Sequence, residues 1–265
     1  MSTDSRVTGG RSVRPGTGRR VAQPEPAADA PLRQTVPGRG LAGPRRPRHS
    51  VDLSAGAAAL PVGDDGVLIG VDVTEEPALL GLFRDSAMDI VLVGGLWLVQ
   101  VIALRAAAAG ARVVVETGRP QVWYALAQAA GAEQPCVTVH GVGQIGAQGA
   151  SVSGPILVLR DCGARPGRSR LAATPWQTTI TLLPYLAHRA DRLLGSADLV
   201  AVQRVSPAES ETVGRTLGLP AVDVQSLSTL GDPVSMWVTK GHRRYVMTHP
   251  TGTEHQLLGP ARRVD

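Results

Sequence analysis

Two adjacent glycines, Gly94 and Gly95, form the strongest candidate for a ligand-binding turn in this sequence. They follow an apolar run at 90–93 and precede another at 96–99, which predicts a buried strand turning directly into a helix. At such a turn the backbone N–H groups of the helix N-terminus can bind a phosphate. A working phosphate loop also needs Lys and a Ser or Thr directly after its glycines. Here the following positions hold Leu, Trp, Leu, Val and Gln, and the one lysine of the chain is Lys240.

Two polar residues at strand ends could complete a nucleotide site at this turn. Asp161 follows the apolar run 156–159, where an acid would hold magnesium, and Gln203 follows the run 199–202, where an amide could contact a terminal phosphate. Each also has a more ordinary interpretation. Asp161 could cap or pair with Arg165 or Arg168, and Gln203 could bond loop amides. We therefore keep a nucleotide site only as the alternative hypothesis, with these cofactor-binding residues: Gly94, Gly95, Asp161 and Gln203.

Other kinds of catalytic site have no motif in this sequence. The six histidines include no pair at i, i+4 and no HExxH, so we predict no metal site. A GxSxG nucleophile motif is also absent. Cys136 and Cys162 form no CxxC and are predicted to be reduced structural thiols. These observations predict no catalytic residue, no cofactor and a protein that is not an enzyme.

The elements that position these residues alternate between strands and helices. A hairpin is predicted around 74–77, and a capping box, Ser206 to Glu209, predicts the start of a helix that runs to Leu217. Thr174-Pro175 predicts another helix near 176–194, kinked at Pro184. Further strands are predicted at 67–73, 79–83, 90–93, 112–116, 137–140, 156–159, 199–202, 234–239 and 244–248, and further helices at 96–109 and 120–130.

Strands that alternate with helices imply right-handed crossovers and a mainly parallel sheet. We predict an α/β fold, a three-layer α/β/α sandwich that is Rossmann-like or P-loop-like, with antiparallel hairpins at the edges. The whole of residues 60–265 should form one domain. The longest apolar run, 90–104, has about 15 residues, fewer than the roughly 20 that a membrane-spanning helix needs.

Residues 1–55 form a basic tail rich in Arg, Pro and Gly. Residues 1–50 hold ten Arg against three Asp or Glu, a net charge of +7, so the remaining residues carry −2 of the total +5. Too little apolar surface is present for folding, and we predict disorder. The tail is either a solvated segment or an arm that contacts acidic surfaces weakly. No aromatic and basic interleaving points to specific nucleic-acid binding.

Six stretches along the chain share an order with a known family: the hairpin Val67–Asp72 to Phe83, the run Ile90–Gly95, Gly110–Pro120, the strand leading to Asp161, Asp198–Val205, and Pro250–Leu258. Together they resemble the motor domain of FtsK/EccC-type ATPases, with the lysine and Ser/Thr of the motor loop replaced. Residues 93–100 and 110–123 are also similar to EccE-like proteins of type VII secretion systems. That similarity covers roughly residues 65–130.

The resemblance implies a degenerate P-loop-like domain in an accessory component of type VII secretion. It implies protein partners from the secretion machinery, or self-association. We predict a cytoplasmic location, either free or peripheral at the inner face of the membrane.

Overall fold

The computed structural model describes residues 66–131, 135–164, 171–187 and 190–263. All of them fall in the compact unit Ala58–Asp265. The predicted tail, residues 1–55, lies outside the described residues. Within the described part, no helix is long and apolar enough to cross a membrane.

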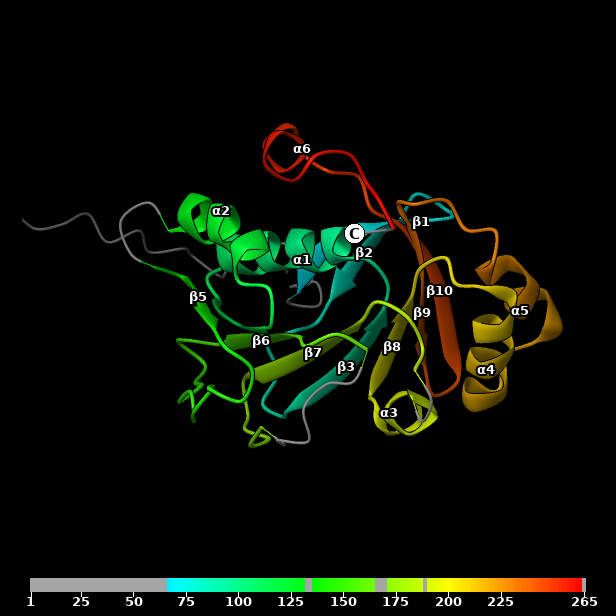
Figure 1. Cartoon of the computed structure of the whole chain (residues 1–265), viewed down its shortest axis with the longest axis horizontal. Coiled ribbons are helices and arrows are strands. Elements are labelled where there is room, and N and C mark those ends of the chain that lie inside the picture. Colours follow the sequence, from blue (N-terminus) through cyan, green and yellow to red (C-terminus); the bar gives the residue numbers. More distant parts are fainter. Residues whose placement is uncertain (1–65, 132–134, 165–170, 188–189, 264–265) are drawn as a thin grey trace, which may run out of the picture. The chain divides into compact units, whose positions relative to one another are not determined.

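Within the described residues, ten strands form one sheet in the order β2-β1-β10-β9-β8-β3-β7-β6-β4-β5 (Figure 1). From β8 to β5 all neighbours pair in parallel, whereas β2 to β8 pair antiparallel. The strands are β1 (Val67–Asp72), β2 (Pro77–Leu80), β3 (Met88–Val93), β4 (Arg112–Thr117), β5 (Val137–His140), β6 (Ile156–Asp161), β7 (Gln177–Leu183), β8 (Leu199–Val202), β9 (Val234–Thr239) and β10 (His242–Met247). The predicted α/β class with a mainly parallel sheet is confirmed, and both hairpins lie at one end of the sheet.

Helices cover both faces of the sheet. On one face lie α1 (Leu96–Ala108), α2 (Gln121–Ala130) and α6 (Gly252–Leu258) (Figure 1). The other face carries α3 (Ala190–Ser196), α4 (Pro207–Leu217) and α5 (Ala221–Leu227). The side chains of β3 alternate between these two layers: Ile90 and Leu92 belong to the first core, and Val91 and Val93 to the second. This alternation is what a strand buried on both faces requires.

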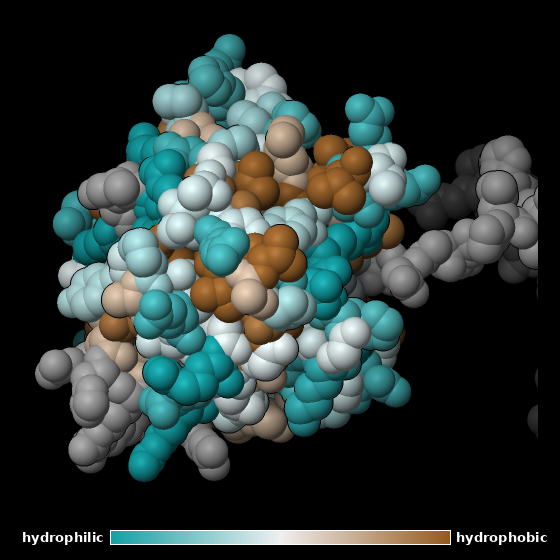
Figure 2. All heavy atoms as spheres, turned by 90° about the vertical axis from the view of Figure 1, so that its right-hand side faces the viewer, coloured by the Kyte–Doolittle hydropathy of each residue, from teal (hydrophilic) through white to brown (hydrophobic). Residues whose placement is uncertain are grey.

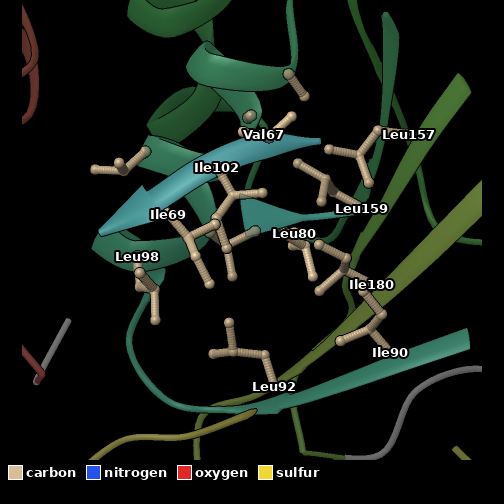
Figure 3. Close-up of a cluster of buried hydrophobic side chains, with 14 of the residues drawn as sticks. Val67, Ile69, Leu80, Ile90, Leu92, Leu98, Ile102, Leu157, Leu159 and Ile180 are labelled. Atoms are coloured by element: carbon tan, nitrogen blue, oxygen red, sulfur yellow. The ribbon is translucent and has the colours of Figure 1, made fainter. Parts of the chain in front are cut away.

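The β1–β2 hairpin contributes to the core beside α1. In Figure 3, Val67 and Ile69 of β1 point toward Ile102 of α1 and toward side chains of the central strands, such as Leu159 and Ile180. These side chains are at most 4% exposed. The hairpin therefore covers part of the same sheet face that α1 covers, and the two share one apolar core.

The predicted helix at 176–194 is wrong over most of its length. Residues 177–183 form the central strand β7, with all seven residues buried, and a short α3 follows only at Ala190. Three threonines and an isoleucine in this run favour a strand because their branched side chains fit a pleated sheet. As a result β7 lies between β3 and β6 and separates the glycine turn from Asp161 by one strand.

Candidate functional site

The glycine turn is held by the polar residue predicted to lie near it. Gln203, 1% exposed, accepts a hydrogen bond from the Gly95 N–H through its side-chain oxygen at 2.8 Å. Its amide nitrogen donates to the Asp232 carbonyl at 3.1 Å. Gly94 N–H donates to the Leu183 carbonyl at 3.0 Å. Gly94, Gly95 and Gln203 therefore do come together, with the Gln203 amide bonded on both sides by the chain itself.

Both glycines are needed because of close packing. A Cβ on Gly95 would lie 2.6 Å from the Arg263 carbonyl oxygen, and one on Gly94 would collide with the Gln203 side chain. The φ angle of Gly95 is −85°, so left-handed backbone is not the reason. Glycine is therefore required at both positions because the Gln203 side chain and the backbone near Arg263 pack directly against the turn.

The segment that approaches the turn is residues 259–263, which we call the strap. Arg263 donates to the Arg204 carbonyl at 2.7 Å and to the Pro184 carbonyl at 2.9 Å. The buried Trp97 indole donates to the Gly259 carbonyl at 3.2 Å. Since the strap's carbonyl oxygens lie against Gly95, a ligand at the start of α1 would have to share this space with the strap or displace it.

Asp161 is engaged in a separate buried network. Its side chain, 2% exposed, accepts hydrogen bonds from Arg119 at 2.9 Å, from the Thr117 hydroxyl at 3.0 Å and from the Trp123 indole at 3.0 Å. The predicted partners Arg165 and Arg168 lie outside the described residues. The network fixes the start of α2 to the ends of β4 and β6 by bonding Asp161 to groups that flank this helix.

A second ion pair extends this network along the same strand ends. Arg160 donates to Glu116 at 2.6 Å, and the Gly143 N–H donates to the other oxygen at 2.7 Å. Burial alone would raise the pKa of the Glu116 carboxyl, but these bonds and the Arg160 charge hold that pKa below its usual value. Burial, followed by the charge of Glu116, raises the pKa of the neighbouring Cys162 thiol to about 11.

Metal-ligating side chains do not cluster in the described part of the chain. No group of three or more His, Cys, Asp or Glu within the described ranges is arranged to hold a metal ion. Sequence reasoning missed Arg119, Thr117 and Trp123, because the pairing of β4 with β6 brings them to Asp161 from about 40 positions away along the chain.

A large apolar opening lies at the end of α1 that is farther from the glycine turn. This opening, which we call the apolar groove, has a volume of about 730 Å³ and lies between β1, the C-terminal ends of α1 and α2, and α6. An ion pair between Arg105 and Glu254, 2.7 Å long, lies at its edge. Small and apolar residues dominate the lining, among them Val67, Leu104, Ala107, Ala108, Ala109, Ala129, Ala130 and Leu257.

Exposed apolar residues are more scattered on the face that Figure 2 draws. Figure 2 shows the face toward the right of Figure 1, where apolar side chains reach the surface as separate patches among hydrophilic ones. Val222 of α5, for example, is 66% exposed. Scattered exposed apolar residues of this kind are normal on soluble proteins. The apolar groove is therefore the stronger candidate for a binding surface.

Comparisons with known proteins return structural similarity alone. The chain matches no protein-family model and no curated protein. It is similar to the genome-packaging NTPase B204 of Sulfolobus turreted icosahedral virus 2 in complex with AMPPCP: 12% identity, TM-score 0.45, 62% of this chain and 98% of that one. VirB4 of Thermoanaerobacter pseudethanolicus gives 7% identity, TM-score 0.48, and coverages of 72% and 98%.

A type VII secretion protein is also among the similar structures. The cytoplasmic domain of the Thermomonospora curvata type VII secretion ATPase EccC is 13% identical, with TM-score 0.42, over 75% of this chain and 31% of that one. The prediction that this chain is not an enzyme is contradicted, since the similar structures include an NTPase and an ATPase. The resemblance to EccE-like proteins stays a prediction.

Proposed function

We propose that this protein is a component of a type VII secretion machinery and that it binds a protein partner through the apolar groove. The groove is the observation that carries the proposal. The sequence resemblance of residues 65–130 to type VII components supports the choice of machinery. A component of this kind would work in the cytoplasm, at the inner face of the membrane.

The lining of the groove suits an α-helix. At about 730 Å³ it lies in the range of roughly 300–1,000 Å³ that is usual for binding pockets. Five of its lining residues are alanines at the ends of α1 and α2, and small side chains allow another backbone to approach closely. An amphipathic helix could therefore lay its apolar face into the groove.

The electrostatics of the groove favour a basic residue on that partner helix. Both α1 and α2 end at the groove, and the C-terminus of a helix carries a partial negative charge. The last turn of α2 has no basic residue, and Arg105 in the last turn of α1 is bound by Glu254. A Lys or Arg of the partner, placed beside Ala108 and Ala129, would compensate these two helix ends.

Site-specific photocrosslinking tests this proposal in cells that make the secretion machinery. A benzophenone amino acid replaces Ala108 in the groove, and in the control it replaces Ala221, an exposed alanine on α5. We expect position 108, and not position 221, to capture a secretion component through an apolar segment that contains Lys or Arg. Ala108→Arg should abolish the complex, and Ala221→Arg should not. Equal capture from both positions, or capture of unrelated proteins only, would refute the proposal.

A second candidate function is nucleotide binding at the glycine turn, involving Gly94, Gly95, Asp161 and Gln203. One observation favours it: the first turn of α1 holds no acidic residue. No side-chain negative charge from that turn therefore offsets the positive end of the helix dipole. Titration with Mg-ATP tests it, using wild type and Arg263→Ala, which loosens the strap. Binding that rises in Arg263→Ala and is lost in Arg263→Ala/Gly95→Val would support this function. No binding by folded Arg263→Ala would rule it out.

A further inference from the structure

A second cavity opens at the amino-terminal ends of the parallel strands, whereas the glycine turn lies at their carboxyl-terminal ends. It has a volume of about 390 Å³ and lies where β3 and β8 begin, beneath the β1–β2 and β9–β10 hairpins. We call it the amino-edge cavity. Neither the glycine turn nor the Asp161 network contributes to its lining.

The inner wall of this cavity is apolar. Ile69, Leu80, Met88 and Trp237 line it, and each is at most 9% exposed. An indole ring and a thioether form favourable contacts with aromatic and aliphatic groups. The wall can therefore hold an apolar side chain of moderate size.

A cationic group lies at the mouth of the cavity. Arg84 donates through Nε to the Gly81 carbonyl at 3.1 Å, and its own carbonyl accepts from Trp176 N–H at 2.7 Å. Its guanidinium rests against Gly81, since a Cβ there would lie 2.9 Å from a terminal nitrogen. Within the described ranges Arg84 has no carboxylate partner, so its terminal nitrogens can bind a ligand carboxylate.

An anionic group lies in the same lining. Asp198 accepts a hydrogen bond from the Asp89 N–H through Oδ2 at 2.8 Å, and its own N–H donates to the Asp89 carbonyl. Its Oδ1 accepts no hydrogen bond from the described residues. Asp198 forms no ion pair with Arg84, and the other arginine of the lining, Arg244, is neutralised by Asp72 at 2.9 Å. The cavity thus offers one separate positive and one separate negative charge beside an apolar wall.

We infer that the amino-edge cavity binds a free α-amino acid with an apolar side chain. The carboxylate pairs with Arg84, the ammonium group pairs with Asp198, and the side chain contacts Met88 and Trp237. A ligand with only one of these charges would leave the other protein charge without a partner. This inference does not depend on the proposed function, because the cavity and the apolar groove have different linings.

Calorimetric titration of the full chain tests the inference with three probes. L-Phenylalanine carries both charges, L-phenylalaninamide lacks the carboxylate, and N-acetyl-L-phenylalanine lacks the ammonium group. We expect L-phenylalanine to bind about tenfold more tightly than either analogue, which is the effect of one lost charged hydrogen bond. No binding of L-phenylalanine at millimolar concentration, or equal binding of all three probes, would overturn the inference.

Two variants assign the charges separately. In Arg84→Gln the difference between phenylalanine and its amide should vanish. In Asp198→Asn, which keeps an acceptor for the Asp89 N–H, the difference between phenylalanine and its N-acetyl derivative should vanish. Arg192→Gln and Asp191→Asn, two exposed positions on α3, serve as matched controls and should bind as wild type. Unchanged discrimination in folded Arg84→Gln and Asp198→Asn would also overturn the inference.

Discussion

Gly95 touches the strap so closely that a single added carbon should matter. In Gly95→Ala the new Cβ meets the Arg263 carbonyl, a backbone atom that can move only with the strap. We expect a loss of about 1–3 kcal/mol in the free energy of unfolding, measured by denaturant titration. Gly252→Ala is the control, since a Cβ there has nothing within 4 Å. Equal stability of the two variants would show that the strap does not pack on the turn.

The carboxylate of Asp161 should be important for stability. Asp161→Asn removes the charge that pairs with Arg119. It also places an amide N–H donor against the Thr117 hydroxyl and the Trp123 indole, which are themselves donors. Because Arg119 is about a third exposed and can regain water, we expect a moderate loss of about 2–3 kcal/mol, again by denaturant titration. Asp191→Asn, an exposed position on α3, should be nearly neutral. A neutral Asp161→Asn would mean that the carboxylate is held for another purpose, such as a ligand.

Cys162 should react slowly with alkylating reagents. With burial and the Glu116 charge raising its pKa to about 11, only about a thousandth of the thiol is ionised at pH 8. We expect iodoacetamide labelling, followed by mass spectrometry, to be far slower than for free cysteine at that pH. Glu116→Gln should accelerate it by removing the nearby negative charge. Rapid labelling of the wild-type residue in the folded protein would contradict the half-buried environment next to the Glu116 charge.

At the scale of the elements, α6 is attached to α1 at both of its ends. Glu254 near the start of α6 pairs with Arg105 at 2.7 Å, and Gly259 after its end accepts from Trp97. Burial would raise the pKa of Glu254, but the bonds from Arg105 and Thr251 and the Arg105 charge hold that pKa below its usual 4.5. A carboxyl with a lowered pKa stabilises the fold above its unfolded pKa. This stabilisation is lost as pH falls through the folded pKa.

Glu254→Gln should therefore destabilise the protein in a pH-dependent way. We expect a loss of about 2 kcal/mol at pH 7, nearly constant down to pH 5, with the difference from wild type shrinking below about pH 4.5. Chemical unfolding at several pH values measures it. Glu211→Gln, an exposed position on α4, is the control and should show no such convergence. If the difference in unfolding free energy between wild type and Glu254→Gln stayed the same at low pH, the Arg105–Glu254 ion pair would not be its cause.

Local sequence signals predicted most elements, and they failed where two signals conflicted. The capping box at Ser206 predicted α4 correctly, because all of its hydrogen bonds are made within one turn. Around 175–183, the Thr174-Pro175 pair favoured the start of a helix, and only the run of β-branched residues indicated the strand β7. The short helices α5 and α6 were missed because seven residues give little helical periodicity.

The candidate site was less predictable, since its contacts join distant parts of the chain. Gln203 was identified as the polar end of a strand, yet its bond to Gly95 spans 108 positions. The strap lies on the turn because of tertiary packing, and no local pattern in residues 259–263 indicates it. Asp161 lies at the end of a strand, as its place after an apolar run indicated, but its Arg119 partner depends on which strand pairs with β6.

Across the whole molecule, stability should fall from the centre of the sheet to its edges. The strands β3, β7 and β6 are paired on both sides and almost wholly buried, whereas β2 and β5 are edge strands. We expect amide hydrogens of β7 to exchange slowest and those of β2 and β5 fastest, as measured by hydrogen–deuterium exchange with mass spectrometry. Exchange of β2 as slow as that of β7 would indicate that a further partner covers this edge.

The position of β1 beside β10 constrains how the chain can fold as it leaves the ribosome. The contact between Asp72 and Arg244 joins residues 172 positions apart. Until β10 is made, β1 and β2 form a two-stranded hairpin, which is marginally stable in water. At roughly 5–20 residues per second, this hairpin would wait on the order of ten seconds or more for its neighbour. During translation the apolar side chains of the hairpin, which later fill the core beside α1, remain exposed and can be bound by chaperones.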